Sequence, residues 1–161
     1  MLQYTAQCIC SFGVNRGGTS MRVLVAYETG HGSTAGIAEA IGQAMQAAGA
    51  EVTIQRCRDV QGVTGFDAFV IGSPIWAGKW LKPAARFLKQ NALTLLRLPT
   101  AIFLATGADG DAHLAMVMRD YVPKVTSIVP EFEPVSVGNF AGMLNFPKYS
   151  ILVRLLMIAI N

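Results

Sequence analysis

Short apolar runs alternate with longer amphipathic segments through most of the chain. The runs at 22–27, 66–72 and 100–105 are apolar without alternation, a pattern typical of parallel strands that are covered on both faces. Two further strands are predicted at 51–57 and 134–140. Charged residues lie at or near the ends of the first of these two, which places it at an edge of the sheet.

Apolar residues recur at helical spacing between and after these runs, and they predict helices at 33–48, 83–91, 111–122 and 150–160. Gly49 stands where the first helix needs a C-terminal cap. On the third helix, Leu114, Met118 and either Tyr121 or Val122 are expected to face the core, and Pro123 should disturb or restart the helix. We predict that Trp80 lies at the rim of the fold.

The alternation of strands and helices predicts an α/β domain with a five-stranded parallel sheet and right-handed crossovers. The 161 residues suit one domain, which we place at 21–161 after a disordered N-terminal extension at 1–20. In such a sheet, ligands bind outside the carboxyl ends of the strands. The loops after the first, third and fourth predicted strands would therefore meet at one edge.

Composition narrows the class of protein. Hydrophobic residues make up 52% of the chain and charged residues 14%, which favours a well-buried domain over disorder. The net charge of +3 is small and no Lys/Arg-rich run exists, so we expect no nucleic acid partner. Cys8, Cys10 and Cys57 form neither a disulfide framework nor a zinc pattern, which fits a reducing, cytoplasmic compartment. No apolar run is long enough to span a bilayer, and the first 20 residues do not read as a signal peptide.

The stretch Val23–Thr34 carries the strongest chemical pattern. A strand feeds a glycine-rich turn that opens a helix, so unpaired N–H groups and the positive end of the helix dipole point at the loop. Glycine lets the backbone approach an anion closely, and hydroxyl groups add donors. The sequence therefore predicts a nucleotide phosphate site made by Thr29, Gly30, His31, Gly32, Ser33 and Thr34.

Three other nucleotide or phosphate sites fit less well. A Walker P-loop requires a lysine after the glycines, and none follows here. A phosphoacceptor receiver requires an aspartate at the end of the third strand, where this chain has Gly72 and Ser73. The dinucleotide fingerprint is matched in spacing by Gly30, Gly32 and Ala35, but its ribose contact would have to come from Arg56, Cys57, Arg58 or Asp59. Dinucleotide binding stays open as a less favoured alternative.

The remaining pattern resembles the flavodoxin family. Thr29, Gly32 and Thr34 take the characteristic places of its FMN-phosphate loop, and His31 stands where a hydroxyl residue is usual. The resemblance implies a three-layer sandwich with strand order 2-1-3-4-5 and FMN as cofactor. It also implies two loops over the isoalloxazine ring, made by Ser73, Pro74, Ile75, Trp76, Ala77 and Gly78 and by Thr106, Gly107, Ala108, Asp109 and Gly110. Because FMN would carry the chemistry, we expect no catalytic side chain and no metal ion.

Each of three residues in these loops has a functional and a structural interpretation. His31 either helps to neutralise the phosphate when protonated or faces solvent. Trp76 either stacks on the ring or packs under the loop. Asp109 either lies near the ring, where it would disfavour an anionic reduced flavin, or stabilises a turn. For His113 we predict only a surface position without a role.

A second resemblance lies downstream. The stretch Phe140–Tyr149, followed by an apolar segment with Arg154, is similar to the stretch after the fifth strand in menaquinone-dependent protoporphyrinogen IX dehydrogenases, FMN enzymes of haem biosynthesis. The resemblance implies a quinone or another redox partner, a porphyrinogen substrate, and peripheral contact with the inner face of the cell membrane through 147–161. That family has one more helix after the apolar segment, so the last helix is expected to be missing here.

Three functional hypotheses follow. The leading one is an FMN-dependent oxidoreductase with a quinone acceptor, of the protoporphyrinogen dehydrogenase kind. The second is an electron-transfer flavodoxin without a substrate of its own, although such carriers are typically acidic and this chain has a pI near 8.9. The third is a truncated, non-catalytic remnant of the flavodoxin fold.

Overall fold

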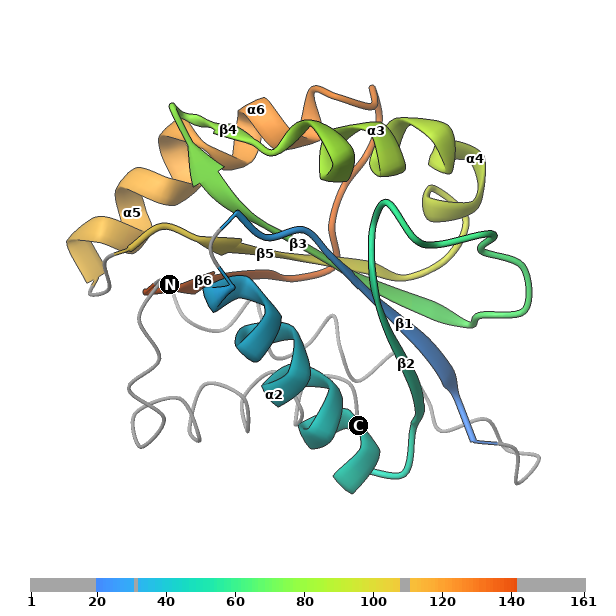
Figure 1. Ribbon diagram of the computed structural model, residues 1–161. Coiled ribbons are helices and arrows are strands. Elements are labelled where there is room, and N and C mark those ends of the chain that lie inside the picture. The colour runs from blue at the N-terminus through green and yellow to red at the C-terminus, as the bar shows by residue number, and fades with distance from the viewer. Residues whose placement is uncertain (1–19, 31, 108–110, 142–161) are drawn as a thin grey trace.

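The computed structural model describes residues 20–30, 32–107 and 111–141. Within them, five parallel strands form one sheet in the order β2-β1-β3-β5-β6 (Figure 1). The strands are β1 (Arg22–Tyr27), β2 (Glu51–Arg56), β3 (Ala68–Trp76), β5 (Thr100–Ala105) and β6 (Val137–Phe140). A short strand, β4 (Lys79–Trp80), pairs antiparallel with β3. The predicted parallel sheet and the edge position of the second strand are confirmed.

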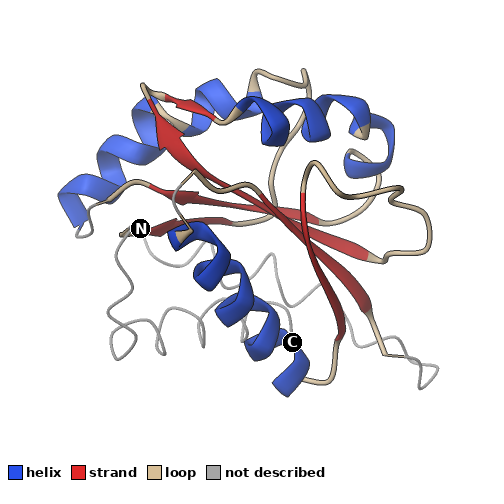
Figure 2. Ribbon diagram, viewed as in Figure 1, coloured by secondary structure: helices blue, strands red, loops and turns tan. Residues whose placement is uncertain are grey.

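Helices cover both faces of this sheet. The helix α2 (Ser33–Ala47) lies on one face, and Figure 2 shows the other described helices on the opposite face. These are α3 (Lys82–Gln90), α4 (Ala92–Leu95), α5 (Asp111–Asp120) and α6 (Val122–Thr126). The architecture is the predicted three-layer α/β sandwich.

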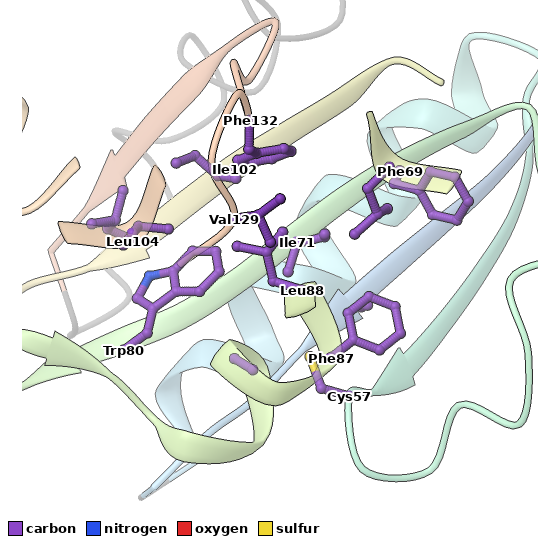
Figure 3. Close-up of a cluster of buried hydrophobic side chains, with 14 of the residues drawn as sticks. Cys57, Phe69, Ile71, Trp80, Phe87, Leu88, Ile102, Leu104, Val129 and Phe132 are labelled. Atoms are coloured by element: carbon purple, nitrogen blue, oxygen red, sulfur yellow. The ribbon is translucent and has the colours of Figure 1, made fainter. Parts of the chain in front are cut away.

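Alternate residues of each strand contribute to two hydrophobic cores, because successive side chains of a strand point to opposite faces of the sheet. Val25 packs on the α2 side with Ile37 and Met45, which recur at helical spacing on the buried face of α2. The larger core lies on the other side (Figure 3), where Ile71 and Ile102 meet side chains from α3, α5, α6 and the segment after α6. Burying one such side chain contributes about 1.5–3 kcal/mol, so this core fixes the outer helices on the sheet.

Gly72 lies on the central strand β3, beside the ring of a residue on β5. It is paired in the β3–β5 ladder with Phe103, and a Cβ at Gly72 would lie 1.9 Å from the Phe103 ring. Phe103 also packs edge to face against Phe140, with ring centroids 5.8 Å apart. No side chain fits at position 72 unless a fully buried ring moves.

The sequence analysis predicted a loop at residues 73–78, but the structure has a β-hairpin there. The strand β3 continues to Trp76, turns at Ala77 and Gly78, and returns as β4. Both turn residues have positive φ, 48° and 74°, as a tight two-residue turn between antiparallel strands requires. The turn brings Trp80 back into the larger core, where it is 5% exposed (Figure 3), so its predicted position at the rim is wrong.

The third predicted helix is correctly placed, and Val122 is buried as one of the predicted alternatives, but the predicted inward positions of Leu114 and Met118 are wrong. The helix ends at Asp120, and α6 restarts with Pro123 in its first turn, as predicted. Val117 is fully buried, whereas Leu114 and Met118 are 41% and 45% exposed. Apolar residues stand on both sides of Val117 in the sequence, so periodicity alone did not select the buried face.

Element boundaries also differ from the sequence prediction at several places, and one short helix was not predicted. The strand β6 begins at Val137 rather than at 134, and Ala92–Leu95 forms a separate short helix. The predicted extension before residue 20, the helix at 150–160 and the membrane contact at 147–161 lie outside the described residues. In the ranges that the structure describes, no helix is long and apolar enough to cross a membrane.

Candidate functional site

The ends of β1, β3 and β5 lie side by side at the carboxyl edge of the sheet. Tyr27 pairs with Gly72 across β1 and β3, and Pro74 pairs with Ala105 across β3 and β5. The loop after β1, the hairpin after β3 and the loop after β5 therefore start from adjacent positions. This arrangement brings together the three predicted parts of the site.

The loop after β1 is closed on itself and leaves the start of α2 open. The N–H of Gly32 donates to Thr29 Oγ1 at 2.8 Å, and the N–H of Ala35 donates to the Gly32 carbonyl at 3.0 Å. Gly32 adopts φ 97°, which favours glycine. Among the described residues, no side chain caps α2 and its first turn has no acidic residue. The positive end of the helix is thus available to an anion.

Thr34 adds a buried hydroxyl group at the same place. It is fully buried, and its Oγ1 has no hydrogen-bond partner in the described structure. An unpaired buried hydroxyl costs about 1–3 kcal/mol, which a bound acceptor would recover. A Cβ built on Gly30 or on Gly32 would meet nothing within 4 Å, so there is space beside the loop. These residues fit a phosphate group.

A buried ion pair, which the sequence analysis missed, lies next to this loop. Glu28 is fully buried and its carboxylate accepts hydrogen bonds from the side chain of Arg58 and, at 3.2 Å, from the N–H of Thr29. Hydrogen bonding to Glu28 raises the pKa of the Arg58 guanidinium above its usual range. The sequence feature that could have revealed this pair is a glutamate directly after an apolar strand, together with arginines at the end of β2. The pairing offsets a negative charge that would otherwise oppose anion binding.

Cys57 directly precedes Arg58 in the chain and is buried. Burial raises the pKa of its thiol to about 12, and the charge of Glu28 contributes to the rise. The thiol is therefore protonated at neutral pH. It is a packing residue of the larger core (Figure 3) and not a nucleophile.

In the hairpin, the predicted residues divide into internal and exposed ones. Ser73 is buried; its hydroxyl donates to the Pro74 carbonyl at 3.0 Å and accepts from the Leu81 N–H at 3.1 Å. It therefore holds the base of the hairpin. Ile75 is half-buried against the larger core, whereas Trp76 is 64% exposed at the tip. A broad aromatic surface thus stands at the edge where a ring is expected.

The loop after β5 begins with a side-chain network that the sequence analysis missed. The hydroxyl of Thr106 donates to Asn139 Oδ1 at 2.7 Å and lies 2.7 Å from His113 Nε2. Because the single hydroxyl proton goes to Asn139, the histidine must donate from Nε2 to the threonine oxygen. His113 is half-buried, and its contact with Thr106 is one that the sequence analysis did not predict. The network ties α5 and β6 to the first residue of this loop.

The structure describes one further residue of the predicted loop after β5. Gly107 is exposed and has φ 78°. The predicted site residues His31, Ala108, Asp109 and Gly110 lie outside the described residues, and so do the two interpretations given for His31 and for Asp109. Within the described part of the chain, no group of histidine, cysteine and acidic side chains is arranged to hold a metal ion.

A comparison with known protein families decides between the flavodoxin and the dinucleotide-binding interpretations of the fold. A family model described as a flavodoxin domain matches residues 24–161. The chain belongs to the flavodoxin domain family. FMN, the cofactor implied by the sequence resemblance, is supported by this match over the dinucleotide alternative. The match does not separate protoporphyrinogen dehydrogenases from other proteins with a flavodoxin domain.

Solved structures confirm the flavodoxin fold. A flavodoxin from the domain Archaea is 23% identical, with a TM-score of 0.59, over 87% of this chain and 96% of the other. The two-electron reduced flavodoxin of Megasphaera elsdenii is 20% identical, with a TM-score of 0.62, over 86% and 98%. The rubredoxin oxygen:oxidoreductase of Desulfovibrio gigas is matched over 35% of its length, with 20% identity, a TM-score of 0.56 and 86% of this chain covered. No curated protein matches the chain.

Proposed function

We propose that this flavodoxin-domain protein binds FMN and works as an oxidoreductase. The observation that carries the proposal is the buried, unpartnered hydroxyl of Thr34 at the uncapped start of α2. When bound, FMN would supply the redox chemistry, since its isoalloxazine ring accepts and releases electrons. The protein would contribute binding, orientation and exclusion of water.

The loop after β1 would hold the phosphate group. Backbone N–H groups at the start of α2, from Ser33 and Thr34, would donate to phosphate oxygens together with the Thr34 hydroxyl. Thr29 would act indirectly, because its oxygen already accepts the Gly32 N–H and so fixes the shape of the loop. The Glu28–Arg58 pair would keep the adjacent charge balanced.

The hairpin and the loop after β5 would enclose the ring. Trp76 would cover one face of the ring by stacking and exclude water from it. Its position is set by the β3–β4 pairing and by the Ser73 hydrogen bonds at the hairpin base. On the other side, the contacts of Thr106 with Asn139 and His113 would orient the start of the second loop.

For the substrate, we propose protoporphyrinogen IX, with a quinone as the acceptor of its hydrogens. The support is the resemblance of Phe140–Tyr149 to the corresponding stretch of menaquinone-dependent dehydrogenases, together with the basic pI of 8.9. The pI disfavours a carrier that docks on basic partners, because like charges oppose such an encounter. Electron transfer without an own substrate is the second candidate, favoured by the flavodoxins among the structural neighbours.

Two measurements test the parts of this proposal separately. The first is an absorbance spectrum of the purified protein, with release and identification of the cofactor, and its melting temperature with excess FMN. A colourless protein whose melting temperature does not respond to FMN would contradict cofactor binding and favour the non-catalytic remnant. The second is porphyrin fluorescence during anaerobic incubation of the FMN-loaded protein with protoporphyrinogen and a quinone. If FMN binds but no quinone-dependent porphyrin forms, the substrate assignment is wrong and the carrier remains.

A further inference from the structure

The outer surface of α3 and α4 carries charge of one sign. Between Asp67 and Asp109 the sequence has no acidic residue, and its basic residues there are Lys79, Lys82, Arg86, Lys89 and Arg97. All five are exposed. The helix on the opposite face of the sheet, α2, has one acidic residue and no basic residue. The stretch from the hairpin to the end of α4 therefore carries only positive charge.

The spacing of these residues makes them a stripe. Lys82, Arg86 and Lys89 recur after four and three residues, which places them on one face of α3. The opposite face of this helix is buried through Ala84, Phe87 and Leu88. The stripe therefore points away from the sheet, on the side of the molecule opposite α2 (Figure 1).

Exposed apolar side chains precede and follow the stripe along the chain. Leu93 of α4 is 77% exposed, and Leu96, three residues later, is 41% exposed. At the other end, Trp76 is 64% exposed at the tip of the hairpin that leads into α3. One exposed leucine is ordinary on a protein surface. Two leucines one helical turn apart, beside a basic stripe, match the composition of helices that lie in a membrane interface.

We infer that this surface, the α3–α4 face (Lys82, Arg86, Lys89, Leu93, Leu96 and Arg97), docks on an anionic phospholipid bilayer. The basic side chains would contact headgroup phosphates, and the two leucines would enter the boundary of the acyl chains. The other helices on this side of the sheet carry both signs of charge: Asp120 of α5 is paired with Arg119, and α6 has Lys124. The exposed Glu131 and Glu133 follow α6 and weaken the attraction. The leucines favour lipid over a nucleic acid, which would use the charges alone.

Docking goes beyond the proposed function and does not depend on it. Its consequence for the reaction does rest on the proposed function, because the α3–α4 face begins directly after the hairpin that carries Trp76. A protein lying on this face would hold the ring end of its site near the lipid, where a quinone dissolves.

The test is co-sedimentation of the full-length protein with vesicles of phosphatidylcholine alone or mixed with phosphatidylglycerol. We expect partition onto the anionic vesicles only, and loss of binding as salt is added. Each basic residue near an anionic surface is worth about fivefold in partition, so Arg86→Gln/Lys89→Gln should weaken binding about 25-fold. The double variant Leu93→Ser/Leu96→Ser should also weaken binding to the anionic vesicles. Arg56→Gln, an exposed charge on β2, is the matched control and should change little.

Three results would overturn the inference. The protein could fail to bind anionic vesicles. Alternatively, Arg86→Gln/Lys89→Gln could bind them as well as the parent protein does, which would place the contact on another segment. Equal binding to a DNA duplex, insensitive to the leucine variant, would show a general polyanion surface. Circular dichroism confirms that each variant is folded, and the FMN spectrum of the same sample keeps a failure of docking distinct from a failure of the proposed function.

Discussion

The carboxylate of Glu28 lies fully buried against the half-exposed guanidinium of Arg58, with Arg58 Nε 3.2 Å from Glu28 Oε2. The pair joins the end of β1 to the turn after β2. It also stands beside the loop in which a phosphate is expected. A charged group this deeply buried depends on its partner, because removal of the partner leaves it without compensation.

We predict that Arg58→Ala lowers the urea midpoint of unfolding clearly more than Arg56→Ala does. Arg56 is exposed on the neighbouring strand, so its loss should have little effect. The double variant Glu28→Gln/Arg58→Ala should recover part of the loss, because an amide tolerates burial better than an unpaired carboxylate. A double variant no more stable than Arg58→Ala would contradict the role given to the pair.

Thr34→Val should have opposite effects on the empty and the FMN-bound protein. Valine has a similar shape and removes the unpaired buried hydroxyl, so the free energy of unfolding without FMN should rise by about 1 kcal/mol. The loss of one donor to the phosphate should weaken FMN binding about tenfold. Urea unfolding and fluorescence titration with FMN measure the two quantities.

Thr100→Val is the control for that experiment. Thr100 is also buried, but its hydroxyl bonds the carbonyls of Leu95 and Leu98, far from the phosphate loop in sequence. Its replacement should destabilise the protein by about 1 kcal/mol and leave the FMN affinity unchanged. If both variants affected FMN binding alike, the hydroxyl of Thr34 would not be a ligand.

Gly72→Ala should destabilise the fold by about 3 kcal/mol, at the upper end of overpacking effects, because the new Cβ would overlap the buried ring of Phe103. Gly62→Ala is the matched control, since a Cβ there meets nothing within 4 Å. Thermal unfolding of the two variants measures the difference. Similar melting temperatures would show that β3 and β5 move apart easily.

Because of the buried thiol of Cys57, we predict that the free energy of unfolding falls at alkaline pH. Folding raises the pKa of this thiol from 9.0 to about 12, so the folded protein favours the protonated, neutral form. This contribution to stability is complete below about pH 9 and is lost as the pH rises from about 9 toward 12, by about 1.4 kcal/mol per unit. Urea unfolding near pH 8 and near pH 10 should therefore show a steeper fall for the parent than for Cys57→Ala. Equal slopes would mean that another group is responsible.

The elements of the sheet were predictable from the sequence because each signal was local. The apolar run of β1 and the helical spacing of Ile37, Ile41 and Met45 each fit only one element type. Gly49, with φ 93°, ends α2 as its position in the sequence indicated. The phosphate loop was predictable for the same reason, since a strand, two glycines and a helix start are consecutive in the chain.

The hairpin was not predictable in this way. Its strands, Ile75 paired with Trp80, are too short for a periodic pattern, and an alanine at φ 48° gives no turn signal. The Glu28–Arg58 pair and the contact of Thr106 with His113 were missed because they join residues that only the folded sheet brings together. At Leu114 and Met118, periodicity allowed more than one inward face, and packing against the sheet selected Val117.

The continuity of β3 with the hairpin bears on when conformational entropy is lost. A free loop that stacks on a ring must be ordered at the moment of binding, which reduces affinity. Here the strand that starts in the core reaches Trp76 without a break, and the hydroxyl of Ser73 fastens the returning chain. The ordering is therefore complete once the protein has folded. Trp76 is a preorganised wall, and a planar ligand must adapt to it rather than draw it in.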